Sequence, residues 1–188
     1  MKVIYLHGFR SDPLLSNTAK YLKGKMGKDF ISYSLYDTPS RNISNIIVEL
    51  NTLHKREELL FVGSSLGGFY AYYLSNHFSA EAILVNPVIR PHLHMRKYMD
   101  TKYRSFYQEQ YITMTSSDIA EFEDLFYAIN GNNVEFSNYT VWLGEKDEFL
   151  NIPEITKHFQ TARELIVFKN EKHRFGQFQE NFERFLTK

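Results

Sequence analysis

Six short apolar runs do most to limit the folds open to this chain. Several of them are apolar throughout, instead of alternating with polar residues, which is typical of strands that helices cover on both faces. The runs span 3–8, 30–37, 59–64, 82–88, 140–145 and 164–170. Segments with the spacing of amphipathic helices lie between them. This alternation predicts an α/β fold, a three-layer sandwich with a mainly parallel sheet of about six strands.

Three segments between or after these runs carry apolar side chains on one helical face. They are Ile43, Ile46, Ile47, Leu50 and Leu53; Ile119, Phe122, Leu125, Phe126 and Ile129; and Phe175, Phe178, Phe182, Phe185 and Leu186. Thr38, Pro39 and Ser40 precede the first stripe and indicate a helix start. Asp118 and Glu121 have the spacing of a capping box, so we expect the second helix to begin at Asp118.

The length of 188 residues suits one domain with a sizeable core, so we expect a single domain over 1–188. The segment of about 88–137 is long for one crossover between two strands. It holds a cluster of Tyr, Arg and Lys residues and then the helical stripe that starts at Ile119. We interpret this segment as a small helical cap inserted over one end of the sheet.

The bulk composition excludes several kinds of function. The formal net charge is zero, with 22 basic and 22 acidic residues, whereas nucleic acids and anionic membranes need a basic surface. The chain has no cysteine, so disulfides, thiolate metal sites and cysteine nucleophiles are ruled out. No apolar run has the length of a membrane span or the pattern of a signal peptide. We therefore expect a cytoplasmic protein without nucleic-acid or membrane partners, and the sequence does not indicate an oligomeric state.

One motif lies where a buried strand gives way to a helix. Gly63-Ser64-Ser65-Leu66-Gly67 fits the pattern G-x-S-x-G, between the apolar LLFV and the helical GFYAYYLSNHF. In that pattern a serine stands clear of the backbone on a strained turn, and the flanking glycines avoid collisions with neighbouring elements. The following helix adds the positive end of its dipole. We therefore interpret Ser65 as a nucleophile, and the alternative is a purely structural turn.

A serine nucleophile needs an imidazole base that a carboxylate orients. His173 lies between the last apolar run and the last helix, and Asp147 follows the fifth run. Both positions are at the carboxyl edge of the predicted sheet, where Ser65 also lies and where such sheets form their sites. The chain order Ser65, Asp147, His173 is that of an α/β hydrolase. The rival candidates are Glu145 and Glu148 for the carboxylate and His158 for the base.

An oxyanion intermediate also needs hydrogen-bond donors. The amide N–H of Leu66, the residue after the candidate nucleophile, is one expected donor. Gly8 follows the first strand and lets the chain turn sharply, so that the Phe9 N–H becomes the second donor. His92 and His94 stand two residues apart, but no third ligand is evident near them, and we predict no metal site.

A resemblance to a known family spans nearly the whole chain. Its stretches are YLHGF, VGSSLGGFYA, VNPVIRP, LGEKDE and EKHRF. These stretches resemble the small YqiA-type esterases of the α/β-hydrolase superfamily. The resemblance implies a minimal α/β-hydrolase fold and esterase activity, with Ser65, Asp147 and His173 in the matching triad positions. It also places Asn86 at the pocket floor beneath the cap.

These observations predict a serine esterase that hydrolyses small carboxylic esters, or thioesters, through an acyl-enzyme and without a cofactor or metal. Candidate substrate-binding residues are His7, Asn86, Tyr98 and Tyr103, although the cap tyrosines equally suit packing of the lid. Two other functions stay open: a catalytically silent binding module of the α/β-hydrolase fold, and a flavodoxin-like phosphate or nucleotide binder whose GSSLGG loop holds an anion. The chain lacks both G-x-x-x-x-G-K-[ST] and G-x-G-x-x-G, which opposes the second of these.

Overall fold

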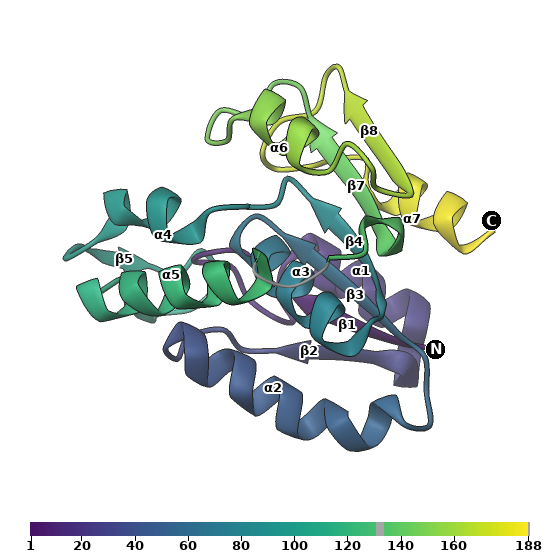
Figure 1. The fold of residues 1–188 in the computed structure, drawn as a ribbon, viewed down its shortest axis with the longest axis horizontal. Coiled ribbons are helices and arrows are strands. Elements are labelled where there is room, and N and C mark those ends of the chain that lie inside the picture. The colour runs from purple at the N-terminus through teal and green to yellow at the C-terminus, as the bar shows by residue number, and fades with distance from the viewer. Residues whose placement is uncertain (131–133, 188) are drawn as a thin grey trace.

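The computed structural model describes residues 1–130 and 134–187. Its six-stranded sheet has the order β2-β1-β3-β4-β7-β8, and every neighbouring pair is parallel (Figure 1). The strands are β1 (Lys2–Leu6), β2 (Phe30–Tyr33), β3 (Leu59–Ser64), β4 (Glu81–Val85), β7 (Tyr139–Gly144) and β8 (Glu164–Phe168). Each of the six apolar runs supplies one strand, so the predicted parallel sheet is confirmed.

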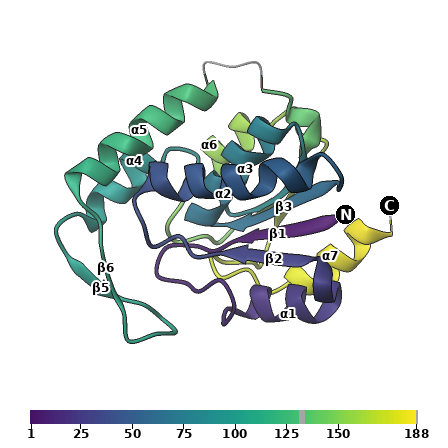
Figure 2. The same cartoon turned by 90° about the horizontal axis from the view of Figure 1, so that it is seen from below.

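Helices cover both faces of this sheet, as Figure 2 shows. One face carries α1 (Asn17–Met26) and α7 (Phe178–Leu186). The other carries α2 (Pro39–His54), α3 (Leu66–Phe78) and α6 (Ile152–His158). The three layers of the predicted sandwich are therefore confirmed.

Strand β3 shows why both faces need a cover. Phe61 is fully buried among side chains of α2 and α3, whereas its neighbours Leu60 and Val62 pack with those of α1 and α7. Successive residues of a strand point to opposite faces, so an uninterrupted apolar run serves two cores at once.

The segment between β4 and β7 forms an insertion beyond the carboxyl ends of the strands (Figure 1). It contains α4 (Pro91–His94), the 3₁₀ turn η2 (Met95–Tyr98), β5 (Lys102–Arg104), β6 (Tyr111–Thr113), α5 (Ser116–Asn130) and the 3₁₀ turn η3 (Phe136–Asn138). A further 3₁₀ turn, η1 (Gly27–Asp29), precedes β2. The antiparallel pair β5–β6 was not predicted, because its three-residue strands carry mixed charged and aromatic side chains without a clear period. The cap limits of 88–137 and the single domain stay predictions.

The start of α5 differs from the prediction. Thr115 and Asp118 form the capping box: the Thr115 N–H donates to Asp118 Oδ2 (2.8 Å) and the Asp118 N–H donates to Thr115 Oγ1 (3.2 Å). The predicted box of Asp118 and Glu121 was wrong by one turn, because both pairs have the same spacing. Glu121 instead accepts from the Ser40 N–H (2.9 Å) at the first turn of α2. The insertion therefore supplies the cap for a helix of the sandwich.

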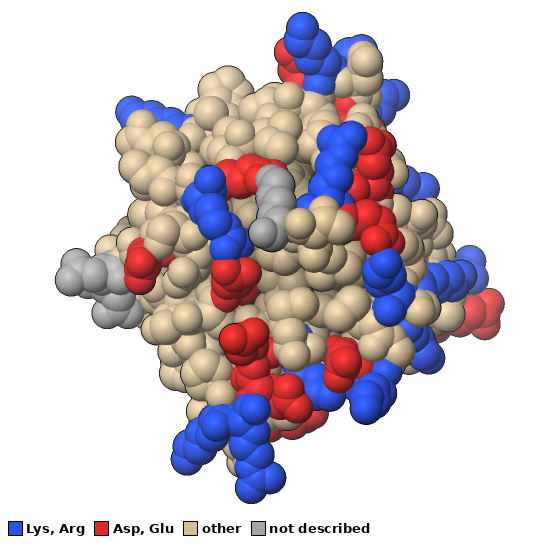
Figure 3. Space-filling model, turned by 90° about the vertical axis from the view of Figure 1, so that its right-hand side faces the viewer, with Lys and Arg blue, Asp and Glu red and all other residues tan. Residues whose placement is uncertain are grey.

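Surface charge and helix composition bear on possible partners. Acidic and basic side chains are interspersed on the face shown in Figure 3, in keeping with the zero formal net charge. Among the helices that the structure describes, none has the length and apolar character needed to cross a membrane.

Candidate active site

Ser65 occupies a strained turn between β3 and α3. Its backbone has φ 55° and ψ −124°, a conformation that residues other than glycine adopt rarely. The turn is held through the main chain: the Ser65 N–H donates to the Val85 carbonyl (3.0 Å), and the Ser65 carbonyl accepts from Gly68 (2.9 Å) and Val88 (3.0 Å). These bonds fix the serine at the carboxyl edge of the sheet.

Glycine is needed at two positions of this turn because neighbouring elements pack closely there. A Cβ atom at Gly63 would overlap the carbonyl of Gly67, and one at Gly67 would overlap the carbonyls of Leu6 and His7. Strand β1, strand β3 and helix α3 therefore approach one another more closely than any side chain would allow. This explains the two glycines of the G-x-S-x-G motif.

Ser65, His173 and Asp147 meet in one hydrogen-bond chain. His173 Nε2 lies 2.9 Å from Ser65 Oγ, and His173 Nδ1 lies 2.7 Å from Asp147 Oδ2. The Asp147 side chain is fully shielded from solvent, whereas His173 keeps 20% of its side chain exposed. The other carboxylate oxygen of Asp147 accepts from the N–H groups of Phe149 (2.8 Å) and Leu150 (3.0 Å). These amides orient the carboxylate toward the imidazole.

The rival residues take other positions. Glu148 accepts from the backbone N–H of His173 (3.2 Å), so it supports the histidine loop without touching the ring. Glu145 is exposed. The His158 ring packs against Tyr72 and Phe159 in an aromatic cluster, with centroids 5.6 Å and 4.7 Å away. The structure therefore brings Asp147 and His173, and not these three, to Ser65.

The predicted oxyanion donors lie beside the serine. An ideal Cβ on Gly8 would be 3.2 Å from the Ser65 Cβ, which measures how closely the loop after β1 approaches the turn. Within the described part of the chain, the amides of Phe9 and Leu66 have no hydrogen-bond acceptor. Two free N–H groups next to a serine hydroxyl are what an oxyanion requires.

His7 and Asn86 were predicted to contact substrate, and both are buried with polar atoms bonded to the chain. His7 Nε2 accepts from the Leu35 N–H (3.1 Å), so Nδ1 carries the proton and donates to the Gly8 carbonyl (2.9 Å). Burial lowers the pKa of His7 to about 4. His7 thus ties the loop after β1 to the loop after β2 as a neutral imidazole.

Asn86 links three chain segments. Its Nδ2 donates to the carbonyls of Lys172 (3.0 Å) and His173 (3.1 Å), and its Oδ1 accepts from the Gly144 N–H (2.7 Å). Asn86 is 1% exposed and has a φ of 43°. It holds the backbone of the histidine loop against the end of β7. Asn86 lines neither of the two cavities described below, and its place at the pocket floor stays a prediction.

Tyr98 and Tyr103 pack on the loop that carries the Phe9 amide. The Phe9 ring lies 5.1 Å from that of Tyr98 and 5.8 Å from that of Tyr103, and the two tyrosine rings are 5.4 Å apart. Neither tyrosine lines either of the two cavities described next. Their role as substrate contacts stays a prediction.

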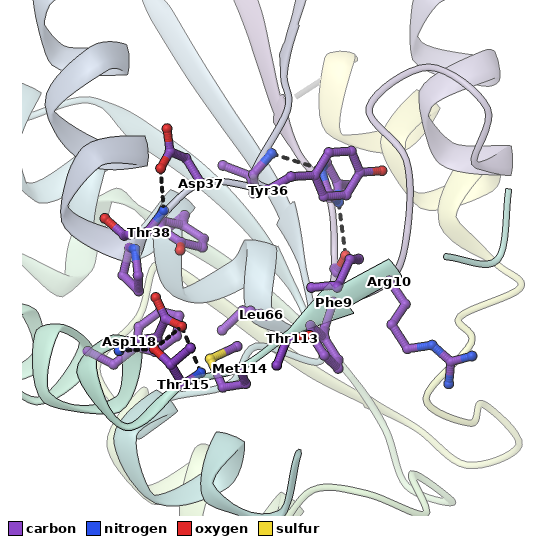
Figure 4. Close-up of a pocket in the computed structure, with 17 residues that line it drawn as sticks. Phe9, Arg10, Tyr36, Asp37, Thr38, Leu66, Thr113, Met114, Thr115 and Asp118 are labelled. Carbon is purple, nitrogen blue, oxygen red and sulfur yellow. Dashed lines mark hydrogen bonds between the residues drawn. The ribbon is translucent and has the colours of Figure 1, made fainter. Parts of the chain in front are cut away.

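Two cavities flank this loop. One, of about 420 Å³, is lined by both Ser65 and His173 and has walls rich in hydroxyl, amide and aromatic side chains. The other, of about 270 Å³, shares Gly8 and Phe9 as wall residues and extends toward α2 and α5 (Figure 4). In Figure 4 the guanidinium of Arg10 points away from this second cavity. The first cavity is the one that gives a ligand access to the serine.

The two histidines considered as metal ligands have different surroundings. His92 packs on Phe126, with ring centroids 4.7 Å apart. His94 lies near His173: burial, with Lys97 and His173 nearby, lowers the pKa of His94 to about 4. Among the described residues, no group of three or more metal-ligating side chains forms a candidate metal site.

Comparison with solved structures identifies the fold class. Est1E from Butyrivibrio proteoclasticus matches over 99% of this chain and 88% of its own, with 12% identity and a TM-score of 0.67. The α/β hydrolase domain-containing protein 10 from mouse matches over 99% and 86%, with 16% identity and a TM-score of 0.67. A carboxylesterase structure from the Thaumarchaeon Nitrososphaera gargenis matches over 99% and 89%, with 14% identity and a TM-score of 0.62. The chain has the α/β-hydrolase fold.

A match in sequence shows the family of this chain. Residues 2–187 match the profile of the Uncharacterised protein family (UPF0227). The chain belongs to this YqiA-like family, and the resemblance drawn from its motifs is confirmed.

Proposed function

We propose that this protein is a serine esterase that hydrolyses small carboxylic esters, or thioesters, through Ser65, His173 and Asp147. One observation carries the proposal: an unbroken hydrogen-bond chain runs from Ser65 Oγ through the imidazole to a carboxylate fully shielded from solvent. The strained serine turn and the two free amides beside it support the same chemistry. The Nitrososphaera gargenis structure is described as that of a carboxylesterase, which adds support from the fold.

The proposed reaction uses this geometry. A carboxylate only accepts hydrogen bonds, so His173 Nδ1 carries the proton and Nε2 presents its lone pair to the Ser65 hydroxyl. His173 removes that proton while Ser65 Oγ bonds to the acyl carbon, and the Phe9 and Leu66 amides stabilise the negative oxygen. His173 then protonates the departing alcohol, which leaves an acyl group on Ser65. Water, deprotonated by the same imidazole, releases the acid and restores the hydroxyl.

Substrate size and setting complete the proposal. The cavity of about 420 Å³ around Ser65 and His173 suits a small substrate better than a long lipid. Phe106 and Tyr107 of the insertion line it, which supports reading 88–137 as a cap on a single hydrolase domain. We expect the reaction in the cytoplasm and without nucleic acid, metal or cofactor.

The test is hydrolysis of 4-nitrophenyl esters of graded acyl length by the purified protein. Ser65→Ala is expected to reduce kcat by about 10⁴-fold or more, and Asp147→Asn by about 10²–10⁴-fold. Ser44→Ala, which alters an exposed serine of α2, should match the wild type. A fluorophosphonate probe should label Ser65 alone, as read by mass spectrometry.

Other results would support the other functions. A folded wild-type protein that neither hydrolyses any ester nor reacts with the probe would favour a catalytically silent binding module. Saturable phosphate or nucleotide binding by such an inert protein, lost on substitution in the GSSLGG loop, would favour the anion binder.

A further inference from the structure

The loop that carries the Phe9 amide is held largely from outside the sheet. The Arg10 carbonyl accepts from the Phe106 N–H (2.9 Å) and from Ser105 Oγ (3.3 Å), and Arg10 Nε donates to the Arg104 carbonyl (2.8 Å). The Arg10 guanidinium also lies 4.3 Å from the centre of the Phe106 ring. All these partners belong to β5 or to the turn between β5 and β6.

Asp12, two residues after Arg10, forms a second connection between this loop and the turn between β5 and β6. Asp12 is 1% exposed, and its Oδ1 accepts from the Leu14 and Leu15 N–H groups, both at 2.8 Å. Its Oδ2 accepts from the Gln108 side-chain amide, at the same turn between β5 and β6. A buried charge needs hydrogen-bond partners on its oxygens. Among the described residues, Gln108 is the only side chain that donates to this carboxylate, and the contact ties the loop to the turn.

Aromatic contacts also attach this loop to the insertion. Tyr98 and Tyr103, which precede these residues in the chain, pack on the Phe9 ring. Arg10 holds its backbone at φ 64°, an uncommon conformation that persists only where surrounding contacts determine it. The segment 98–108 thus contacts the loop through its main chain, a buried charge and aromatic rings.

We propose that segment 98–108 is a clamp that positions the Phe9 amide toward Ser65, with Gln108 as a positioning residue that acts through Asp12. The inference rests on the proposed esterase function, because an amide needs a fixed position only where negative charge develops. Tyr98 and Tyr103 then hold the loop and do not bind substrate. A donor fixed before the reaction stabilises the transition state without reorganisation, and misplacement by about 1 Å costs on the order of 10²-fold in rate.

The test measures ester hydrolysis by Gln108→Ala and Gln108→Glu. The first removes the donor, and the second keeps the shape of the side chain but sets a second carboxylate against Asp12. We expect kcat to fall about 10- to 100-fold in both, with KM within about twofold of the wild type. Affinity for a trifluoromethyl ketone, which forms a tetrahedral oxyanion on a serine, should fall by the same factor as kcat/KM. The matched control is Gln110→Ala, since the Gln110 side chain has no hydrogen bond within the described part of the chain.

A second measurement does not depend on activity. Amide hydrogen exchange of Ser11, Leu14 and Leu15, whose N–H groups donate to Gly8 and Asp12 within the loop, should speed up in Gln108→Ala, while exchange in β1 and α1 stays at the wild-type rate. Unchanged exchange in the loop, unchanged kcat, or a loss confined to KM would each overturn the clamp while leaving the esterase proposal intact. A wild-type protein that is inert to esters and to the phosphonate probe would overturn both.

Discussion

Asn86 gives the sharpest test of how the site is supported. Replacing it with alanine removes three hydrogen bonds, to the Lys172 and His173 carbonyls and from the Gly144 N–H. Each bond contributes about 1 kcal/mol net. Alanine at a φ of 43° adds about 1 kcal/mol of backbone strain, because asparagine tolerates this region better. The expected loss is therefore about 4 kcal/mol in the free energy of unfolding, or about 8–16 °C in Tm for a chain of this size.

Two further variants and an activity assay complete this test. Asn86→Asp keeps the acceptor for Gly144 and the backbone preference, but it turns a carboxylate oxygen toward two carbonyls, so it should also destabilise the protein. Asn51→Ala, at an exposed position of α2, should stay within about 0.5 kcal/mol of the wild type. Urea unfolding gives the free energies, and ester hydrolysis below the melting range should show a lower kcat, because the His173 backbone loses two tethers. An Asn86→Ala variant within about 1 kcal/mol of the wild type would refute the reasoning.

Two other predictions follow from close packing and from burial. Gly67→Ala should lower the free energy of unfolding by about 3 kcal/mol or more, because its Cβ would overlap the Leu6 and His7 carbonyls. Gly24→Ala in α1, where a Cβ meets nothing within 4 Å, should instead raise it by about 0.5–1 kcal/mol, and equal effects in urea unfolding would contradict the packing argument. Burial lowers the pKa of His7 to about 4, so the unfolded chain binds the extra proton first as the pH falls from about 6.5. His7 should therefore contribute about 3 kcal/mol that is fully present above pH 6.5 and is lost as the pH falls to about 4. Because burial also lowers the pKa values of His92, His94 and His158, the check is the pH slope of wild type minus that of His7→Asn, and identical slopes would exclude this contribution.

The sheet and the meeting of Ser65, Asp147 and His173 could be predicted because their signals are local. An uninterrupted apolar run of about five residues already indicates a strand that is covered on both faces. Once parallel strands are inferred, residues that follow different strands must share one edge. The catalytic roles of these three residues stay predictions until activity is measured.

The support of the site could not be predicted, because it depends on which distant segments become neighbours. Asp12 and Gln108 are 96 residues apart, and nothing in a lone Asp before proline distinguishes a surface turn from a buried anchor. The wrong start of α5 has the same origin. Thr115, Asp118 and Glu121 form two overlapping pairs of equal spacing, and only contact with α2 decides that Glu121 caps Ser40.

The same division bears on His7 and Asn86, whose contact with substrate stays a prediction. A polar residue at the carboxyl edge of a parallel sheet satisfies the sequence criterion for a binding residue, whether its side chain turns toward the cavity or toward the backbone. In this chain both side chains bond to backbone groups of the loops, at Gly8, Leu35, Gly144, Lys172 and His173, and His7 also lines the second cavity. A loop bent sharply enough to present Ser65, Phe9 and His173 cannot pair its own amides and carbonyls as a strand does. Buried polar side chains near such a site therefore form hydrogen bonds first with these backbone groups. Polar side chains that stay unpaired and line the cavity are the better candidates for binding substrate.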